Sequence, residues 1–280
     1  MAVAEQSFRH FGLERDPFTP TADPAFFYFT MDFERCLFGL KKSIDSRYGI
    51  VLVFGNYGTG KTSLMRHLFY HIARRTHLYN TAVLGSPNPS WSGHTLLEEI
   101  CHQFRIPTTR PTVNAYQHAF NQFLINNRNR INTLIIDDAQ NLEKKEHLEI
   151  LRLLQNIETP EHKLLNLVIF AQMELIPIVK AHPSFEQRVN NAYVLNPLSF
   201  EDTVNMIRFR LQKAGLDPQE KLFDDESLRT IYEYSQGIPR DVVTICRNAM
   251  VVAKRIGQKE IQDSIVLYAI NNLTVKGLVG

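Results

Sequence analysis

The sequence is poor in several features that define common protein classes. It contains three cysteines in 280 residues, Cys36, Cys101 and Cys246, and they form neither a CxxC pair nor a metal-ligand spacing with histidines. This scatter argues against a disulfide framework or a zinc site, and it fits a reducing compartment. We therefore expect each cysteine to be a small core residue rather than a nucleophile.

Long apolar runs are also missing. No run approaches the roughly 20 residues that cross a bilayer, and residues 1–15 mix charged with apolar residues and lack the apolar stretch of a signal peptide. A soluble, cytoplasmic chain is therefore expected. The net charge is only +2, and 44% hydrophobic with 21% charged residues is ordinary for a globular protein. The length favours one large domain and a smaller one.

One stretch organises the chain: Gly55-Asn56-Tyr57-Gly58-Thr59-Gly60-Lys61-Thr62, directly after the apolar run Ile50–Phe54. It fits the P-loop pattern G-x-x-x-x-G-K-[ST], and the segment that follows is amphipathic. The order of strand, glycine turn and helix lets backbone N–H groups and a helix N-terminus face one phosphate cluster. We predict that residues 55–63, which include Ser63, bind ATP. Lys61 would reach the β- and γ-phosphates, and Thr62 would place its hydroxyl on Mg²⁺.

A second apolar run ends in two acids, Asp137 and Asp138, about 75 residues after the P-loop. In a P-loop protein this pattern predicts that Asp137 orders the Mg²⁺ shell and that Asp138 polarises the attacking water. A third apolar run, 164–171, ends at Gln172. Apolar strands separated by helices indicate a parallel sheet covered on both faces, and such sheets bind ligands at the carboxyl ends of their strands. Gly55, Asp137 and Gln172 are therefore predicted to form one site.

The fold class predicted is an α/β P-loop core followed by a small all-helical domain. Helical spacing is expected at 32–48, from the P-loop to about 75, 96–104, 113–126 and 144–157, with strands at 50–54, 81–84, 133–136 and 164–172. After Asn196-Pro197 four helices are predicted, at 199–214, 225–234, 239–256 and 259–270, with Ser199 and Asp224 as N-caps.

Three parts follow from this pattern: an aromatic, proline-punctuated arm at 1–31, the α/β domain at 32–196 and a helical lid at 197–280. Prolines after aspartates favour turns in the arm, so we expect a packed segment laid over the main domain. Two alternatives stay open for the arm. It covers the adenine or contacts a neighbouring subunit, or it only fills the core.

Several motifs together resemble an AAA+ ATPase and, more closely, the ExeA/GspA family of secretion ATPases. They are Phe11-Gly12-Leu13, Asp16-Pro17-Phe18, Asp137-Asp138-Ala139-Gln140-Asn141-Leu142, Ala171-Gln172-Met173-Glu174-Leu175 and Gly237-Ile238-Pro239-Arg240. The resemblance covers about residues 8–270. More distant relatives are the ATP-dependent transposition regulators of the TnsC, TniB and MuB type and the origin-binding initiators.

The resemblance implies further site residues. Gln172 matches the sensor 1 position, where a polar side chain meets the γ-phosphate or the attacking water. Arg188 matches the arginine that a subunit offers to its neighbour's nucleotide, and Arg240 matches sensor 2 on the lid. Such charges neutralise the γ-phosphate as the reaction proceeds. Each arginine has an alternative interpretation as a surface ion-pair residue.

One departure from the family concerns the second acid, because this chain has Asp138 where the family usually has glutamate. The side chain is one methylene shorter, and a misplacement near 1 Å at a reacting centre costs on the order of 10²-fold in rate. The hypothesis is slow hydrolysis with intact ATP binding, so that ATP acts more as an assembly switch than as fuel.

Two functions from different classes remain. In the first, a homo-oligomeric ring or filament regulates assembly of a secretion or pilus machine. In the second, an ATP-gated scaffold polymerises on double-stranded DNA and recruits a transposition partner. Secretion members carry a membrane segment and a peptidoglycan-binding part beyond the ATPase, whereas this sequence ends at Gly280. Residues 61–136 hold eight basic side chains against two acidic ones, a bias that suits a phosphate backbone but also an ordinary solvated face.

Overall fold

The computed structural model describes residues 8–21, 23–108 and 111–277. The chain divides into two compact units. One contains Met31–Tyr57 and Lys61–Leu195, and we call it the α/β unit. The other contains Met1–Thr30, Gly58–Gly60 and Asn196–Gly280, and we call it the helical unit.

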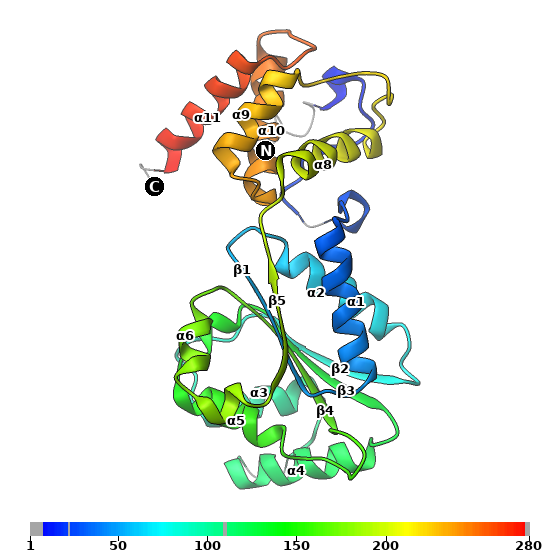
Figure 1. Ribbon diagram of the computed structural model, residues 1–280, viewed down its shortest axis with the longest axis vertical. Helices are drawn as coiled ribbons and strands as arrows, with labels where there is room; N and C mark the ends of the chain where they lie inside the picture. Colours follow the sequence, from blue (N-terminus) through cyan, green and yellow to red (C-terminus); the bar gives the residue numbers. More distant parts are fainter. Residues whose placement is uncertain (1–7, 22, 109–110, 278–280) are drawn as a thin grey trace. The chain divides into compact units, whose positions relative to one another are not determined.

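The α/β unit is built on a parallel sheet whose strands, in the described residues, follow the order β2-β3-β4-β1-β5 (Figure 1). Strands β1 and β4 are buried along their whole length, because helices cover both of their faces. This confirms the predicted fold class. The strands are β1 (Ile50–Gly55), β2 (Tyr79–Leu84), β3 (Ile131–Ile136), β4 (Leu165–Ala171) and β5 (Val189–Leu195).

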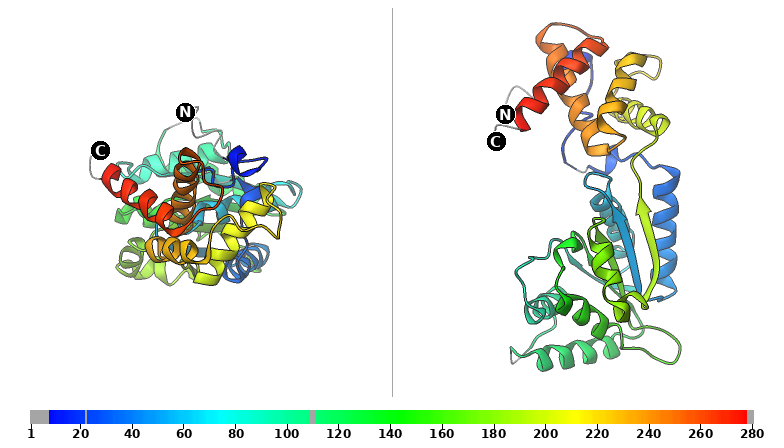
Figure 2. Two further views of the ribbon diagram at one scale, coloured as in Figure 1. Left: turned by 90° about the horizontal axis from the view of Figure 1, so that it is seen from above. Right: turned by 60° about the vertical axis from the view of Figure 1, so that its left-hand side comes forward.

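Helices cover both faces of this sheet (Figures 1 and 2). Side chains alternate along β1: Ile50, Leu52 and Phe54 belong to the core shared with α3 and the helices after it, so Val51 and Val53 face the opposite side, where α1 and α2 lie. The helices are α1 (Met31–Asp45), α2 (Lys61–Ala73), α3 (Gly93–Gln103), α4 (Val113–Asn126), α5 (Lys145–Leu154), α6 (Leu175–Lys180) and α7 (Pro183–Glu186).

The sequence pattern missed β5, α6 and α7. Strand β5 is an edge strand that pairs only with β1 among the described strands, and its residues alternate between partly buried and exposed. Asn190 and Asn191 lie inside it and obscure the apolar signal. The two helices are six and four residues long, too short for helical periodicity to stand out.

The helical unit contains the four helices predicted from the sequence. They are α8 (Phe200–Lys213), α9 (Asp225–Ser235), α10 (Pro239–Arg255) and α11 (Asp263–Gly277). Both predicted N-caps are confirmed. The Ser199 hydroxyl accepts the N–H of Asp202 at 3.0 Å, and the Asp224 carboxylate accepts the N–H of Ser227 at 2.7 Å.

The expectation that the N-terminal arm lies over the main domain is wrong for its described residues. Apolar side chains of the arm belong to the core of the helical unit, where they pack with α8–α11: Phe11, Leu13, Phe18 and Phe26. Arg210 on α8 holds this segment, because its guanidinium donates to the carbonyl of Pro17 at 2.7 Å and to the carbonyl of Phe26 at 3.1 Å. The same group lies 5.5 Å from the centre of the Phe26 ring.

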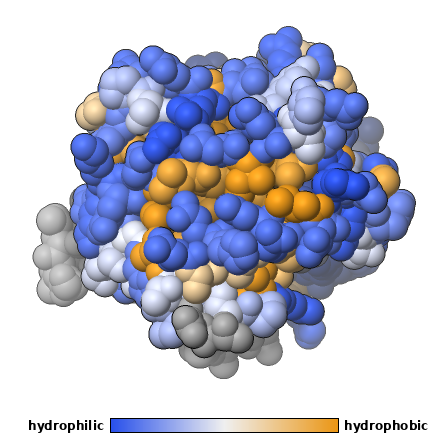
Figure 3. Space-filling model, turned by 90° about the horizontal axis from the view of Figure 1, so that it is seen from below, coloured by the Kyte–Doolittle hydropathy of each residue, from blue (hydrophilic) through white to orange (hydrophobic). Residues whose placement is uncertain are grey.

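Surface and composition agree with a globular protein. In the described parts of the chain, no helix has the length and apolar character to span a membrane. Seen from below, the molecule shows one apolar band between hydrophilic residues (Figure 3), and exposed apolar atoms are normal on folded proteins. All three cysteines are buried and unpaired, as predicted, and burial raises the pKa of Cys36 and Cys101 to about 12.

Candidate nucleotide-binding site

The strand order brings three predicted features to one edge of the sheet. Neighbouring strands β3, β4 and β1 end together, because Phe54 pairs with Ala171 and Ile136 pairs with Ile169. The P-loop leaves β1, Asp137 follows β3 and Gln172 follows β4. Parallel sheets bind ligands at this edge, so the topology supports a single site here.

The P-loop connects β1 directly to α2. Gly58 and Gly60 have φ angles of +81° and +100°, in the left-handed region that glycine adopts without strain. A Cβ at Gly60 would meet no atom within 4 Å, so open space lies beside the loop at that residue. Within the remaining loop, Asn56 and Tyr57 are exposed and Thr59 is buried.

Lys61 and Thr62 open helix α2. The Lys61 side chain is 7% exposed, and its ammonium donates to the carbonyls of Gly55 at 2.7 Å and Asn56 at 3.0 Å. The Thr62 hydroxyl donates to Asp137 Oδ2 at 2.8 Å. The next residue, Ser63, is partly buried in the first turn of α2. A cation, a hydroxyl and a carboxylate therefore lie together at a helix N-terminus.

Asp137 is 3% exposed and has partners on both oxygens, since Oδ1 accepts the N–H of Asp138 at 3.1 Å and Oδ2 accepts the Thr62 hydroxyl. Burial raises the pKa of Asp137 above its ordinary value. The hydrogen bond from Thr62 lowers this pKa, the charge of Asp138 raises it, and the Asp138 N–H and the Lys61 charge lower it. Burial has the largest effect on this pKa, so a bound cation would stabilise the ionised carboxylate.

Asp138 has a left-handed backbone, with φ 51° and ψ 37°, which is uncommon for a residue other than glycine. Gln140 in the short helix η3 (Ala139–Asn141) contacts it: Nε2 of Gln140 donates to Asp138 Oδ1 at 3.2 Å. Oε1 of the same amide accepts the N–H of Gln172 at 3.2 Å. Gln140 belongs to the motif that carries the family resemblance, but the sequence pattern predicts no role for it.

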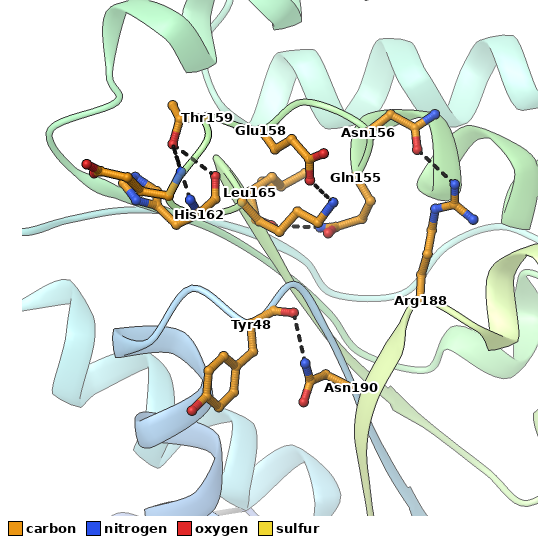
Figure 4. Close-up of polar contacts among 11 residues, drawn as sticks. Tyr48, Gln155, Asn156, Glu158, Thr159, His162, Leu165, Arg188 and Asn190 are labelled. Carbon is orange, nitrogen blue, oxygen red and sulfur yellow. Dashed lines mark hydrogen bonds and ion pairs between the residues drawn. The ribbon is translucent and has the colours of Figure 1, made fainter.

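Arg188 lies at the amino-terminal end of β1, whereas the P-loop follows the carboxyl end of that strand. It precedes Val189, which pairs with Ile50, the first residue of β1. The length of β1, about 17 Å at 3.3 Å per residue, separates Arg188 from the loop. Its guanidinium donates to the carbonyl of Ser184 at 2.5 Å. It also donates to Asn156 Oδ1 at 3.2 Å (Figure 4). The structure therefore does not bring Arg188 together with Lys61 of the same chain.

Arg240 belongs to the helical unit, where it is the second residue of α10 after Pro239. Its N–H donates to the carbonyl of Gly58, in the same unit, at 3.4 Å. A Cβ at Gly58 would lie 2.8 Å from the Ile238 side chain and 3.0 Å from that of Arg240. Glycine is therefore required here both for its φ angle and for this close approach.

Comparison with known proteins defines the class. Residues 44–179 match the family model described as AAA domain. The fold is similar to that of the Aeropyrum pernix ORC1 protein in complex with DNA, with a TM-score of 0.68 and 17% identity over 92% of this chain and 69% of that chain. It is also similar to the Aeropyrum pernix ORC2 protein in its ADPNP-ADP complexes, with a TM-score of 0.61 and 15% identity over 88% of this chain and 71% of that chain. The chain therefore has the fold of AAA+ P-loop proteins.

A sequence relative narrows the class. The chain is 31% identical over 275 residues to General secretion pathway protein A of Aeromonas hydrophila. The match covers 95% of this chain and 49% of the relative, so the chain spans about half the length of that protein. The resemblance to the ExeA/GspA family predicted from the motifs is confirmed.

Proposed function

We propose that this chain binds ATP and Mg²⁺ at subunit interfaces of a homo-oligomer and that ATP-dependent assembly regulates a larger machine. The observation that carries the proposal is the cluster of Lys61, Thr62 and Asp137 at the carboxyl edge of the sheet, held by hydrogen bonds of 2.7 to 3.0 Å. The match to the family model described as AAA domain and the resemblance to the ExeA/GspA family of secretion ATPases support ATP hydrolysis as the activity.

The residues present fit ATP and Mg²⁺. Open space beside Gly60 and the N-terminus of α2 suit a phosphate chain, and the buried ammonium of Lys61 now satisfies its donors on loop carbonyls that it can exchange for phosphate oxygens. The Thr62 hydroxyl and the Asp137 carboxylate are hard oxygen ligands of the kind Mg²⁺ selects. When bound, Mg²⁺ neutralises phosphate charge as it develops.

Each remaining residue has a proposed role in this site. Asp138 orients the attacking water, and Gln172 contacts the γ-phosphate or that water. Arg240 acts from the lid, the proposed domain at 197–280 that follows the core at 32–196. Arg188 completes the site of a neighbouring subunit, because it lies a strand's length from its own P-loop. An arginine supplied in trans is worth about 10³ to 10⁵ in rate.

The proposal that the larger machine is a secretion machine rests on the similarity to General secretion pathway protein A. General secretion pathway protein A is a secretion protein by its name, and a cytoplasmic subunit that assembles with ATP would suit such a pathway. A second candidate is an ATP-gated DNA scaffold for transposition. One observation favours it, the eight basic side chains against two acidic ones in residues 61–136. Binding through such charges would tolerate any DNA sequence and weaken steeply with salt.

Electron microscopy of the purified protein with ATP, with and without duplex DNA, tests these functions. We expect ATP-dependent rings or filaments that form equally with and without DNA. Rings or filaments that form along DNA would instead establish the scaffold, and a monomer under every condition would refute both. The Lys61→Ala variant is the matched control, since it retains the surface charges elsewhere but loses the phosphate contact.

Mixing two inactive variants tests the shared site. Lys61→Ala impairs the nucleotide site of its own subunit but keeps Arg188, whereas Arg188→Ala keeps the P-loop but withholds the trans arginine. Mixed oligomers contain some interfaces with both groups intact, so their ATPase activity should exceed the sum of the two variants measured separately. Activity equal to that sum would show that Arg188 does not act between subunits.

A further inference from the structure

We propose that Gln140 is a positioning residue that holds the carboxylate of Asp138 at a fixed place beside the end of β4. One side-chain amide joins the two predicted catalytic positions: Nε2 donates to Asp138 Oδ1 and Oε1 accepts the N–H of Gln172, both at 3.2 Å. The inference rests on the proposed function, because it concerns the acid assigned to the attacking water.

The two contacts fix the orientation of the amide. The backbone N–H of Gln172 can only donate, so it requires the amide oxygen of Gln140. The amide NH₂ then faces Asp138, whose ionised carboxylate can only accept. A flipped amide would set oxygen against carboxylate and NH₂ against N–H, and it would lose both hydrogen bonds. The arrangement is therefore specific to a side chain with a donor and an acceptor at one end.

Asp138 depends on outside contacts for its position. Its left-handed backbone is intrinsically unfavourable, and its side chain makes no capping hydrogen bond to η3. The N–H of Asp138 is held by Asp137 Oδ1, and its carboxylate is held by Gln140. Asp138 is only partly buried, so packing alone does not fix its rotamer. Without the amide, the carboxylate is free to rotate away from the water it orients.

A purely structural role for Gln140 is the competing explanation: the amide would only fasten the end of β4 through Gln172. Two variants separate the explanations. Gln140→Glu keeps an acceptor for the Gln172 N–H but turns a carboxylate oxygen towards Asp138. Gln140→Met has a similar length and loses both hydrogen bonds. Positioning predicts that both variants are impaired, whereas fastening predicts that only the methionine variant is.

Single-turnover ATP hydrolysis and the Kd for ADP are measured for wild type, both variants and Gln219→Glu, an exposed glutamine in a turn of the helical unit that controls for the charge change. Both Gln140 variants should hydrolyse ATP about 10- to 100-fold more slowly, as expected for a misplaced reacting group, with Kd for ADP within about twofold and the control unchanged. Wild-type rates in Gln140→Glu would overturn the proposal.

The same variants are then made in an Asp138→Asn background. If Gln140 acts through the carboxylate of Asp138, its removal should cause no further loss once that carboxylate is gone, since residues that act as a unit are not additive. An equal fold-loss in both backgrounds would overturn the proposal.

Hydrogen exchange at the Gln172 amide provides a readout that needs no turnover. Gln140→Met should speed exchange of this amide, and Gln140→Glu should leave it protected. If wild type binds nucleotide but never hydrolyses it, the proposed ATPase function fails, and the contact is then judged by exchange alone. Unchanged exchange in Gln140→Met would refute the contact on which the inference depends.

Discussion

Lengthening Asp138 by one methylene should accelerate ATP hydrolysis. The N–H of Asp138 is held by Asp137 Oδ1, so the added C–C bond of about 1.5 Å extends the carboxylate from a fixed backbone, beyond the position at which Gln140 now contacts it. A shift of about 1 Å at a reacting centre is worth on the order of 10²-fold, or about 2.7 kcal/mol of activation free energy. Asp138→Glu should therefore gain up to about 100-fold in kcat.

Steady-state phosphate release at saturating ATP and Mg²⁺ measures this change. Asp138→Asn should fall below wild type, because it removes the carboxylate while keeping the side-chain length. Asp225→Glu, at a side chain 71% exposed in the first turn of α9, adds the same methylene away from the site and should match wild type. The reasoning is refuted if wild type matches or exceeds Asp138→Glu at equal ATP affinity.

Three further predictions concern Lys61, Asp137 and Arg210. Lys61→Ala should weaken ATP binding about 10- to 100-fold, the value of a lost hydrogen bond to a charged group, and equilibrium titration with a fluorescent nucleotide measures it; binding within twofold of wild type would contradict the role of the lysine. Burial raises the pKa of Asp137, so protons compete with Mg²⁺ at a higher pH than at an ordinary aspartate, and the Mg²⁺-dependent part of nucleotide affinity should fall as the pH is lowered towards this raised pKa. Asp137→Asn removes the titrating carboxylate, so it should abolish this pH dependence of the nucleotide affinity, and a dependence that persists in the variant would refute the assignment. The ionised carboxylate also lowers the free energy of unfolding above its raised pKa, and protonation relieves this cost. Arg210→Met leaves the carbonyls of Pro17 and Phe26 without their donor and should lower the free energy of unfolding by about 2 to 4 kcal/mol, measured by urea denaturation; a change below about 0.5 kcal/mol would show that the N-terminal segment does not depend on this arginine.

The sequence alone determined those features that depend on nearby residues. The P-loop, the strand before it and the helix after it form one local pattern, and the structure has β1 and α2 at that place. The caps Ser199 and Asp224 depend on hydrogen bonds three residues away. The apolar runs that form β3 and β4 also fix which polar residues follow them, so the sequence assigns Asp137 and Gln172 to one edge of the sheet.

Only the tertiary structure decided features that depend on distant partners. Aromatic residues in the N-terminal arm indicate burial, but they do not say against which element, and they pack with α8–α11 rather than on the sheet. Strand β5 gains its conformation from pairing with β1, since its own sequence carries two asparagines. The sequence predicts no role for Gln140, because its partner, the Gln172 N–H, reaches its amide oxygen only when β4 pairs with β3. Local hydrogen bonds and periodicity can be predicted from the sequence, because they involve residues a few positions apart. The contacts of a side chain across strands depend on the tertiary structure.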